Sequence, residues 1–143
     1  VPHALVLAGF AHQEINGRFL ERRQQESLVN GMSTFHAENG ACFVYWCKKQ
    51  SRWKASRMSD LPAVQGGRSL GFAGARPGAD ILSRKLRSGW LEWDGSNWKG
   101  SRKAGIVSVE PLHGKELEIS QSVNQPLVLP STMGNLLSAV EKK

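Results

Sequence analysis

A run of aromatic and β-branched residues around Asn39-Gly40 is the feature that most limits how this chain can fold. The run extends from Val29 to Lys54 and reads VNGMSTFHAENGACFVYWCKKQSRWK. Asn-Gly is the dipeptide that best fits the two positive-φ positions of a type I′ hairpin turn. A two-residue turn of this kind pairs Phe35 with Val44 across the hairpin. The segment therefore predicts two antiparallel strands, followed by a third that opens at Trp53.

The stretch from Cys42 to Cys47, CFVYWC, carries bulky side chains at successive positions. Because both faces of such a strand are apolar, we expect it to lie in the middle of a sheet that is covered on both sides. Its two cysteines are five residues apart, which places them on opposite faces and about 16 Å from each other. A disulfide needs Cα atoms within about 7 Å. We therefore expect buried free thiols that neither pair nor share a metal ion.

A second hairpin is predicted from Gly89 to Lys99, where GWLEWDGSNWK surrounds Asp94-Gly95. A two-residue turn here pairs Leu91 with Trp98. Each indole can bury on the order of 200 Å², so tryptophans in strands are expected to hold the core together. The tryptophans expected in the core are Trp46, Trp53, Trp93 and Trp98.

Weaker patterns fill the rest of the chain. Asp60 is a candidate cap for a short helix, with Pro62 tolerated in its first turn and Gly66 ending it. The segment Ala4–Phe10 is apolar and is expected to be either a buried strand or a docking strand. The remaining predictions are a helix over Leu61–Gln65 and strands over Ser69–Ala75, Ile106–Val109 and Leu117–Ile119.

These elements predict a mainly β fold, an antiparallel meander or small barrel-like sheet with one or two short helices. The 143 residues suffice for one core, so residues 1–120 are expected to form a single β-rich domain. With 40% hydrophobic and 22% charged residues, the composition is that of a globular protein and not of a disordered chain. Residues 121–143 are expected to form an extended C-terminal arm that ends in a short amphipathic helix.

The end of this arm carries a single apolar stripe with the spacing i, i+3, i+4, i+7. A helix this short is marginal in water, so the stripe must pack either on the body of the domain or on a partner. We take the second alternative as the basis of a docking hypothesis. The partner-docking residues it predicts are Met133, Leu136, Leu137 and Val140.

The formal net charge of +7 is unevenly distributed. The segment from Ala41 to Lys103 carries 13 Lys and Arg against 4 Asp and Glu, whereas the rest of the chain is slightly acidic. A field of this sign attracts nucleic acid, anionic lipid or an acidic protein surface, although a solvated basic face is an equally simple interpretation. The basic surface predicted for electrostatic steering consists of Arg84, Lys85, Arg87, Arg102 and Lys103.

The longest apolar run, Ala4 to Ala11, is far shorter than the roughly 20 residues that a membrane-spanning helix needs. We therefore expect no membrane span. The chain begins with Val1, which is compatible either with removal of a targeting segment or with a fragment of a longer chain.

No motif of enzymatic chemistry is present, so we expect no catalytic residues, no metal ligands and no cofactor. The sequence lacks HExxH, zinc-type Cys/His spacings and GxSxG, and its glycine-rich stretch from Gln65 to Gly74 lacks the GxxxxGK[ST] phosphate loop. His12 with Glu14 and His36 with Glu38 are each two residues apart. On strands each pair shares a face, and a hydrogen-bonded surface pair is the expected outcome.

Basic residues alternate with tryptophan at Arg52-Trp53-Lys54 and at Trp98-Lys99. On a β-surface such a pattern serves single-strand binders, whose indoles stack bases while cations hold phosphates. Alternation along a strand also sends Trp53 to one face and its basic neighbours to the other, as in any half-buried strand. Nucleic-acid binding is therefore kept as an alternative function.

The order of these motifs, ING-F, VNG, FVYW, RWK and GWLEWDGSNW, resembles a β-rich module that recurs in predicted proteins of dinoflagellate algae. The resemblance covers roughly Ile15 to Val109, and the chain departs from the module at Gly66–Leu86 and in its C-terminal arm. The resemblance implies lineage and a β-rich module. It implies no enzyme class and supplies no catalytic residues.

Together these features predict a non-catalytic, peripheral accessory subunit that docks on a larger protein assembly with an acidic surface. The apolar N-terminal strand and the C-terminal arm are expected to make the contacts. The lineage implied by the resemblance favours an organelle, with the plastid and the periphery of a thylakoid photosystem as the first candidates, over the cytoplasm. A homo-oligomer is not expected, and a single-stranded nucleic-acid-binding or ribosome-associated module is the alternative.

Overall fold

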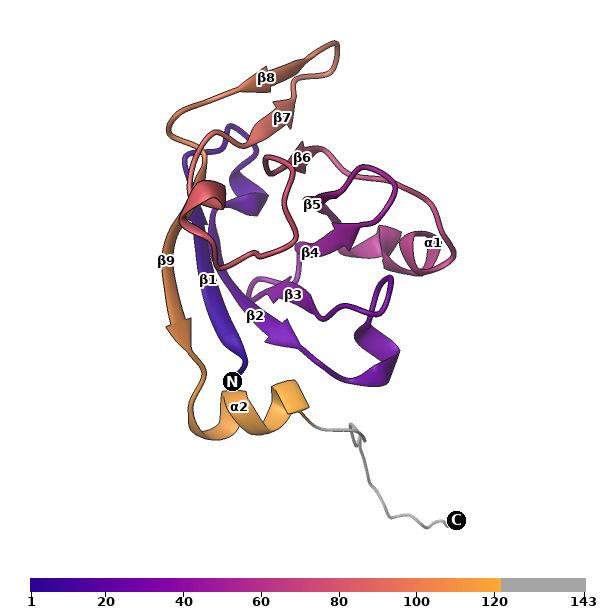
Figure 1. The fold of residues 1–143 in the computed structure, drawn as a ribbon, viewed down its shortest axis with the longest axis vertical. Coiled ribbons are helices and arrows are strands. Elements are labelled where there is room, and N and C mark those ends of the chain that lie inside the picture. Colours follow the sequence, from indigo (N-terminus) through magenta and orange to yellow (C-terminus); the bar gives the residue numbers. More distant parts are fainter. Residues whose placement is uncertain (122–143) are drawn as a thin grey trace.

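The computed structural model describes residues 1–121, in which nine antiparallel strands form one curled sheet with two short helices outside it (Figure 1). The mainly β fold predicted from the sequence is thus confirmed. The predicted C-terminal arm and its apolar stripe lie outside the described residues. The strands are β1 His3–Ala8, β2 Gly17–Arg22, β3 Thr34–Ala37, β4 Cys42–Cys47, β5 Arg52–Arg57, β6 Ala73–Gly74, β7 Leu91–Trp93, β8 Trp98–Gly100 and β9 Gly105–Pro111. The helices are α1 Leu61–Gln65 and α2 Gly114–Gln121.

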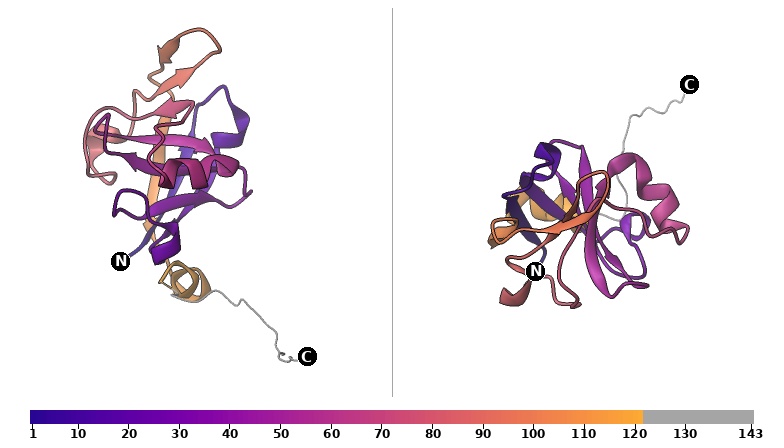
Figure 2. Two further views of the ribbon diagram at one scale, coloured as in Figure 1. Left: turned by 90° about the vertical axis from the view of Figure 1, so that its right-hand side faces the viewer. Right: turned by 90° about the horizontal axis from the view of Figure 1, so that it is seen from above.

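The strand order is β8-β7-β6-β5-β4-β3-β2-β1-β9, a meander whose last strand returns to lie beside the first. The sheet curls into a half-barrel (Figure 2), and backbone hydrogen bonds draw its two ends together. Trp90 N donates to Ala104 O over 3.2 Å, and Ile106 N donates to Arg87 O over 3.1 Å. These bonds hold the start of β9 against the residues that precede β7.

The sheet separates two apolar clusters. The larger one fills the inside of the curl and includes Phe35, Val44, Trp53 and Trp90. The smaller one lies on the outer face, where Val64 of α1 covers alternate residues of β4. The smaller cluster is built around Val29, Phe43, Tyr45, Cys47 and Val64. Strand β4 is therefore central and covered on both sides, as its sequence predicts, and its two cysteines are buried free thiols.

The first hairpin has the predicted register, with Phe35 opposite Val44. The predicted type I′ turn is wrong, because only Gly40 has a positive φ and Asn39 does not. Asn39 instead uses its side-chain oxygen to accept the backbone N–H of Ala41 over 2.8 Å. This Asx-type bond stabilises a four-residue connection that keeps the same pairing.

The second hairpin differs from the prediction by two residues. Leu91 pairs with Gly100 and Trp93 pairs with Trp98, so that the loop has four residues and not two. The cause is Asp94, whose carboxylate accepts the backbone N–H groups of Ser96 (2.8 Å) and Asn97 (2.7 Å). These bonds favour a wider turn than the Asp-Gly dipeptide alone suggests.

Three further expectations need correction. The N-terminal strand β1 lies between β2 and β9, so its backbone is fully used within the sheet and it is not a docking strand. Strand β6 is limited to Ala73–Gly74, because the glycines around it weaken pairing. Leu117–Ile119 belongs to helix α2 and not to a strand.

Helix α2 packs on β2 through polar contacts and not through a broad apolar face. Arg18 of β2 binds Glu116 with two parallel bonds of 2.7 and 3.0 Å. Helix α1 forms where it was predicted, although the Asp60 carboxylate accepts the Ser56 hydroxyl (2.7 Å) and makes no side-chain cap. Neither helix within residues 1–121 is long and apolar enough to cross a membrane.

Candidate binding site on the outer face of the sheet

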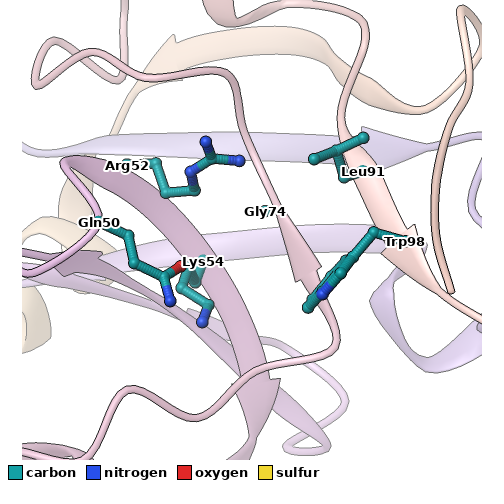
Figure 3. Close-up of a pocket in the computed structure, with 6 residues that line it drawn as sticks. All are labelled: Gln50, Arg52, Lys54, Gly74, Leu91 and Trp98. Carbon is teal, nitrogen blue, oxygen red and sulfur yellow. The ribbon is translucent and has the colours of Figure 1, made fainter.

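A hollow of about 110 Å³ lies on the outer face of the sheet, where strands β5 to β8 meet (Figure 3). Cationic side chains of β5 form one side of it, and apolar side chains of the second hairpin form the other. We call it the Gly74 hollow, after the residue at its centre. It is lined by Gln50, Arg52, Lys54, Gly74, Leu91 and Trp98.

The pairing of the strands explains why these residues meet. Lys54 pairs with Gly74, and Gly74 pairs with Leu91, so the three residues point to the same side of three adjacent strands. Arg52 lies two residues before Lys54 and therefore shares its face. Trp98 pairs with Trp93, which lies two residues after Leu91. Because glycine has no side chain, the middle of this row is empty.

The two cations at the hollow are short of partners. The Nε of Arg52 is buried and has no hydrogen-bond partner among the described residues. Lys54 is only 4% exposed, and its ammonium donates one bond, to the carbonyl of Ser69 over 2.9 Å. Burial lowers the pKa of Lys54, which the nearby Cys47 raises and the Arg52 guanidinium lowers. An anion in the hollow would favour the charged form of Lys54, because it would offset the burial of the ammonium and its repulsion by Arg52.

The tryptophans are not all in the core. Trp53 and Trp90 are 2% and 0% exposed, as expected of core residues, whereas Trp93 and Trp98 are 37% and 44% exposed. The prediction that Trp93 and Trp98 are buried is therefore wrong, while Trp46 is half-buried beside Trp53. The exposed pair forms an edge-on contact, with ring centroids 5.5 Å apart. This contact holds the Trp98 ring at the rim of the hollow.

The predicted basic surface lies elsewhere on the molecule. Arg84 and Lys85 are exposed on a short 3-10 helix, and Arg102 and Lys103 are exposed in the connection before β9. The hydrogen bonds between residues 87–90 and 104–106 bring these two segments together. Arg87 is half-buried at their junction. The four exposed residues thus form a second cationic region, and none of them lines the Gly74 hollow.

The expected histidine–carboxylate pairs do not form. His12 binds Glu92, which lies 80 residues later in the chain, and not Glu14. Glu14 pairs with Arg57 over 3.2 Å. His36 shares a hydrogen bond of 2.9 Å with Thr34, while Glu38 pairs with Arg18.

The Glu92 carboxylate has a structural role that the sequence does not indicate. It accepts the backbone N–H groups of Ala11 (2.9 Å) and His12 (2.6 Å), in addition to the His12 imidazole. Burial raises the pKa of Glu92, but these bonds outweigh burial and lower it overall. The contact ties β7 to the connection between β1 and β2. We call it the Glu92 clasp.

A wider hollow of about 370 Å³ opens beside Val1. Its buried carboxylate, Glu21, already accepts His3 N (2.8 Å), Arg23 Nε (3.0 Å) and Ser33 Oγ (2.7 Å). Among the residues described, none that lines this hollow has a buried side-chain nitrogen or oxygen without a hydrogen-bond partner. Within the part of the chain that the structure describes, no group of three or more His, Cys, Asp or Glu side chains is placed to hold a metal ion.

Comparison with protein-family models, with curated proteins and with solved structures finds no match to this chain. The fold and the site define the kind of molecule this is. It is a β-rich half-barrel module with a cation-lined, indole-rimmed hollow on its outer face.

Proposed function

We propose that this protein is a non-catalytic accessory module that attaches to a larger assembly through an anionic part of that assembly. The observation that carries the proposal is the Gly74 hollow, where Arg52 and Lys54 form no ion pair with any described carboxylate and lie beside the exposed ring of Trp98. Opposite charge speeds and orients association, and an aromatic ring adds contact area at little cost in side-chain entropy.

The second cationic region, formed by the exposed residues Arg84, Lys85, Arg102 and Lys103, supports the same proposal because it offers an anionic partner a separate positive contact. The stripe of Met133, Leu136, Leu137 and Val140 is proposed as an additional apolar contact, outside the described residues. The N-terminal strand is no longer part of the proposal, since β1 is internal to the sheet.

A non-catalytic role is supported by the pair of His12 and Glu92, which is engaged in structural hydrogen bonds. The Glu92 carboxylate is occupied by two backbone N–H groups and an imidazole, so it is engaged as a clasp. The proposed setting is an organelle, favoured to be a plastid, where a photosystem and a ribosome are the assemblies to consider, and the protein is proposed to act there as a single copy. That setting rests on the resemblance to the dinoflagellate module.

The experiment is affinity capture from an extract of the native source, at low and at high salt, with quantification of the retained proteins. Three baits are compared: the wild type, Arg52→Gln at the hollow, and Lys115→Gln. Lys115 is exposed on α2, at the opposite end of the molecule from the β7–β8 hairpin (Figure 1), so its variant removes one charge without touching the site.

The proposal predicts that the wild type and Lys115→Gln retain the subunits of one assembly, that Arg52→Gln retains less of them, and that high salt releases them. Equal retention by all three baits, or retention that salt does not change, would contradict the proposal.

A further inference from the structure

We infer that the Gly74 hollow binds single-stranded nucleic acid, with a backbone phosphate held by Arg52 and Lys54 and a base stacked on Trp98. The inference rests on the proposed function, because it names the chemical class of the anionic partner at the same surface. It unites two sequence motifs, Arg52-Trp53-Lys54 and Trp98-Lys99, in a way that neither motif shows alone.

The cationic side suits a phosphate. Arg52 presents a planar guanidinium whose Nε has no partner among the residues described, and Lys54 uses only one of its three ammonium donors. Arginine and lysine are the common donors to phosphate oxygens. The hollow, with a volume of about 110 Å³, has room for a phosphate group beside these two cations. A phosphate held there places the attached base near the rim, where Trp98 is exposed.

The rim suits a base. Trp98 is 44% exposed, and its edge-on contact with Trp93 limits how far the ring can turn. Stacking on such a ring is indifferent to base identity, because every base has a flat π face. The indole comes from β8, whereas Trp53, the indole next to Arg52 in sequence, is buried on the inner face. The exposed indole beside Arg52 in space is therefore Trp98, and not Trp53, which is its neighbour in sequence.

A second hollow with cations around it lies on the same face of the sheet. Tyr45 and Cys47 are the cross-strand partners of Lys54 and Arg52, and they line a second hollow of about 150 Å³. The cations that surround this second hollow are Lys48, Lys49 and Arg68. These three cations are exposed, so they offer a neighbouring phosphate of the same strand further contacts on this face.

The observations favour a single strand over two other anionic partners. In a duplex the base faces are stacked inside, so Trp98 has no face to stack on. An acidic peptide supplies carboxylates for the cations but not a regular series of flat rings for the indole. These two partners therefore become controls in the experiment.

Binding is measured by fluorescence anisotropy of a labelled oligouridylate of about 12 nucleotides, a size within the range that small β-modules cover. The protein is the full chain, at two salt concentrations. The same titration is repeated with an RNA duplex of equal length and with a labelled polyglutamate peptide. A thermal melt of each variant confirms that it is folded.

Three variants test the three parts of the site. Trp98→Ala removes the stacking ring and is expected to weaken oligouridylate binding by about fivefold or more. Arg52→Gln is expected to lower the slope of log affinity against log salt by about 0.7. Gly74→Val fills the hollow without removing a cation or an indole, since a Cβ at Gly74 meets only ordinary contacts of 3.5 Å or more. Lys115→Gln is the control for loss of one charge.

The inference is supported if the oligouridylate binds more tightly than the duplex and the peptide, and if Trp98→Ala and Gly74→Val both weaken it while Lys115→Gln does not. Peptide or duplex binding of equal strength, unchanged by Trp98→Ala, overturns the inference and leaves the proposed function standing. If none of the three probes shows salt-dependent binding, the inference is overturned. The capture experiment then tests the proposed function separately.

Discussion

At the scale of single residues, the tryptophans differ in the roles that their surroundings permit. Trp53 and Trp90 are buried, and each indole N–H donates to a backbone carbonyl, Ala79 O at 2.9 Å and Leu86 O at 2.7 Å. Trp98 is exposed, and no described group accepts its N–H. The sequence assigns Trp53 and Trp98 the same role, because both stand in strands beside basic residues.

Truncation of these two tryptophans should therefore have different effects on stability. Trp53→Ala leaves a cavity in the core and an unpaired carbonyl, and is expected to lower the free energy of unfolding by about 3–5 kcal/mol. Trp98→Ala removes a half-exposed ring and is expected to lower it by less than about 1 kcal/mol. Urea denaturation of both variants measures the difference, and a similar loss in the two would contradict the assignment of Trp98 to the surface.

His36 gives the protein a defined response to pH. Burial, followed by the neighbouring positive charge of Arg22, lowers the pKa of His36 from 6.5 to about 4. Between these values the unfolded chain binds a proton that the folded protein does not, so stability falls as the pH falls from about 6.5 to about 4. The expected loss from this group is about 2–3 kcal/mol. His36→Gln should flatten this part of the stability curve in urea denaturation. A variant curve parallel to that of the wild type would contradict the prediction.

At the scale of elements, strands β3 to β5 and the core of β9 could be predicted from the sequence, whereas β2 was not predicted and the second hairpin was predicted with the wrong register. Strands β3 to β5 are long, aromatic and adjacent, so pattern and turn fix their register. The second hairpin was displaced by the side chain of Asp94, which widens the loop. Helix α2 was missed because its contacts are polar and involve Arg18, about 100 residues earlier.

The candidate site could be predicted only in part, for a similar reason. Arg52 and Lys54 share a face by simple alternation. Their meeting with Trp98 depends on β6, a strand of two residues that joins β5 to β7. A strand of two residues is too short to show the alternation of apolar and polar residues that marks a strand in a sequence. The sequence therefore does not indicate that the second hairpin lies on this face.

The Glu92 clasp should hold the second hairpin against the body of the sheet. Glu92→Ala removes the acceptor of two backbone N–H groups and is expected to lower the free energy of unfolding by about 2–3 kcal/mol. It should also speed hydrogen exchange at the amides of Ala11 and His12. Hydrogen-exchange NMR measures both amides. Unchanged protection at both positions would show that the carboxylate does not secure this connection.

At the scale of the whole molecule, close backbone approaches hold the ends of the curl together. A Cβ at Gly105 would lie 2.1 Å from the carbonyl oxygen of Arg87, and one at Gly9 would lie 2.0 Å from that of Lys103. Any side chain there must push the segments apart. Closure of the curl therefore depends on glycine at position 105, whereas Gly9 follows β1 and meets the segment before β9, the strand that pairs with β1.

Gly105→Ala is accordingly expected to be costly, with a loss of at least about 2 kcal/mol in the free energy of unfolding. Gly74→Ala is the matched control, because a Cβ there meets only ordinary contacts and should change stability by less than about 1 kcal/mol. Urea midpoints of the two variants measure this contrast, and equal midpoints would argue against closure of the curl at Gly105.

The most direct measurement is an NMR titration that follows the indole N–H signals while a single-stranded oligouridylate is added. We expect the Trp98 signal to move most and the Trp93 signal next, while the signals of Trp53 and Trp90, whose indole N–H groups are hydrogen-bonded inside the fold, stay in place. Saturable binding that leaves the Trp98 signal unmoved, or that shifts the two buried indoles instead, would contradict it.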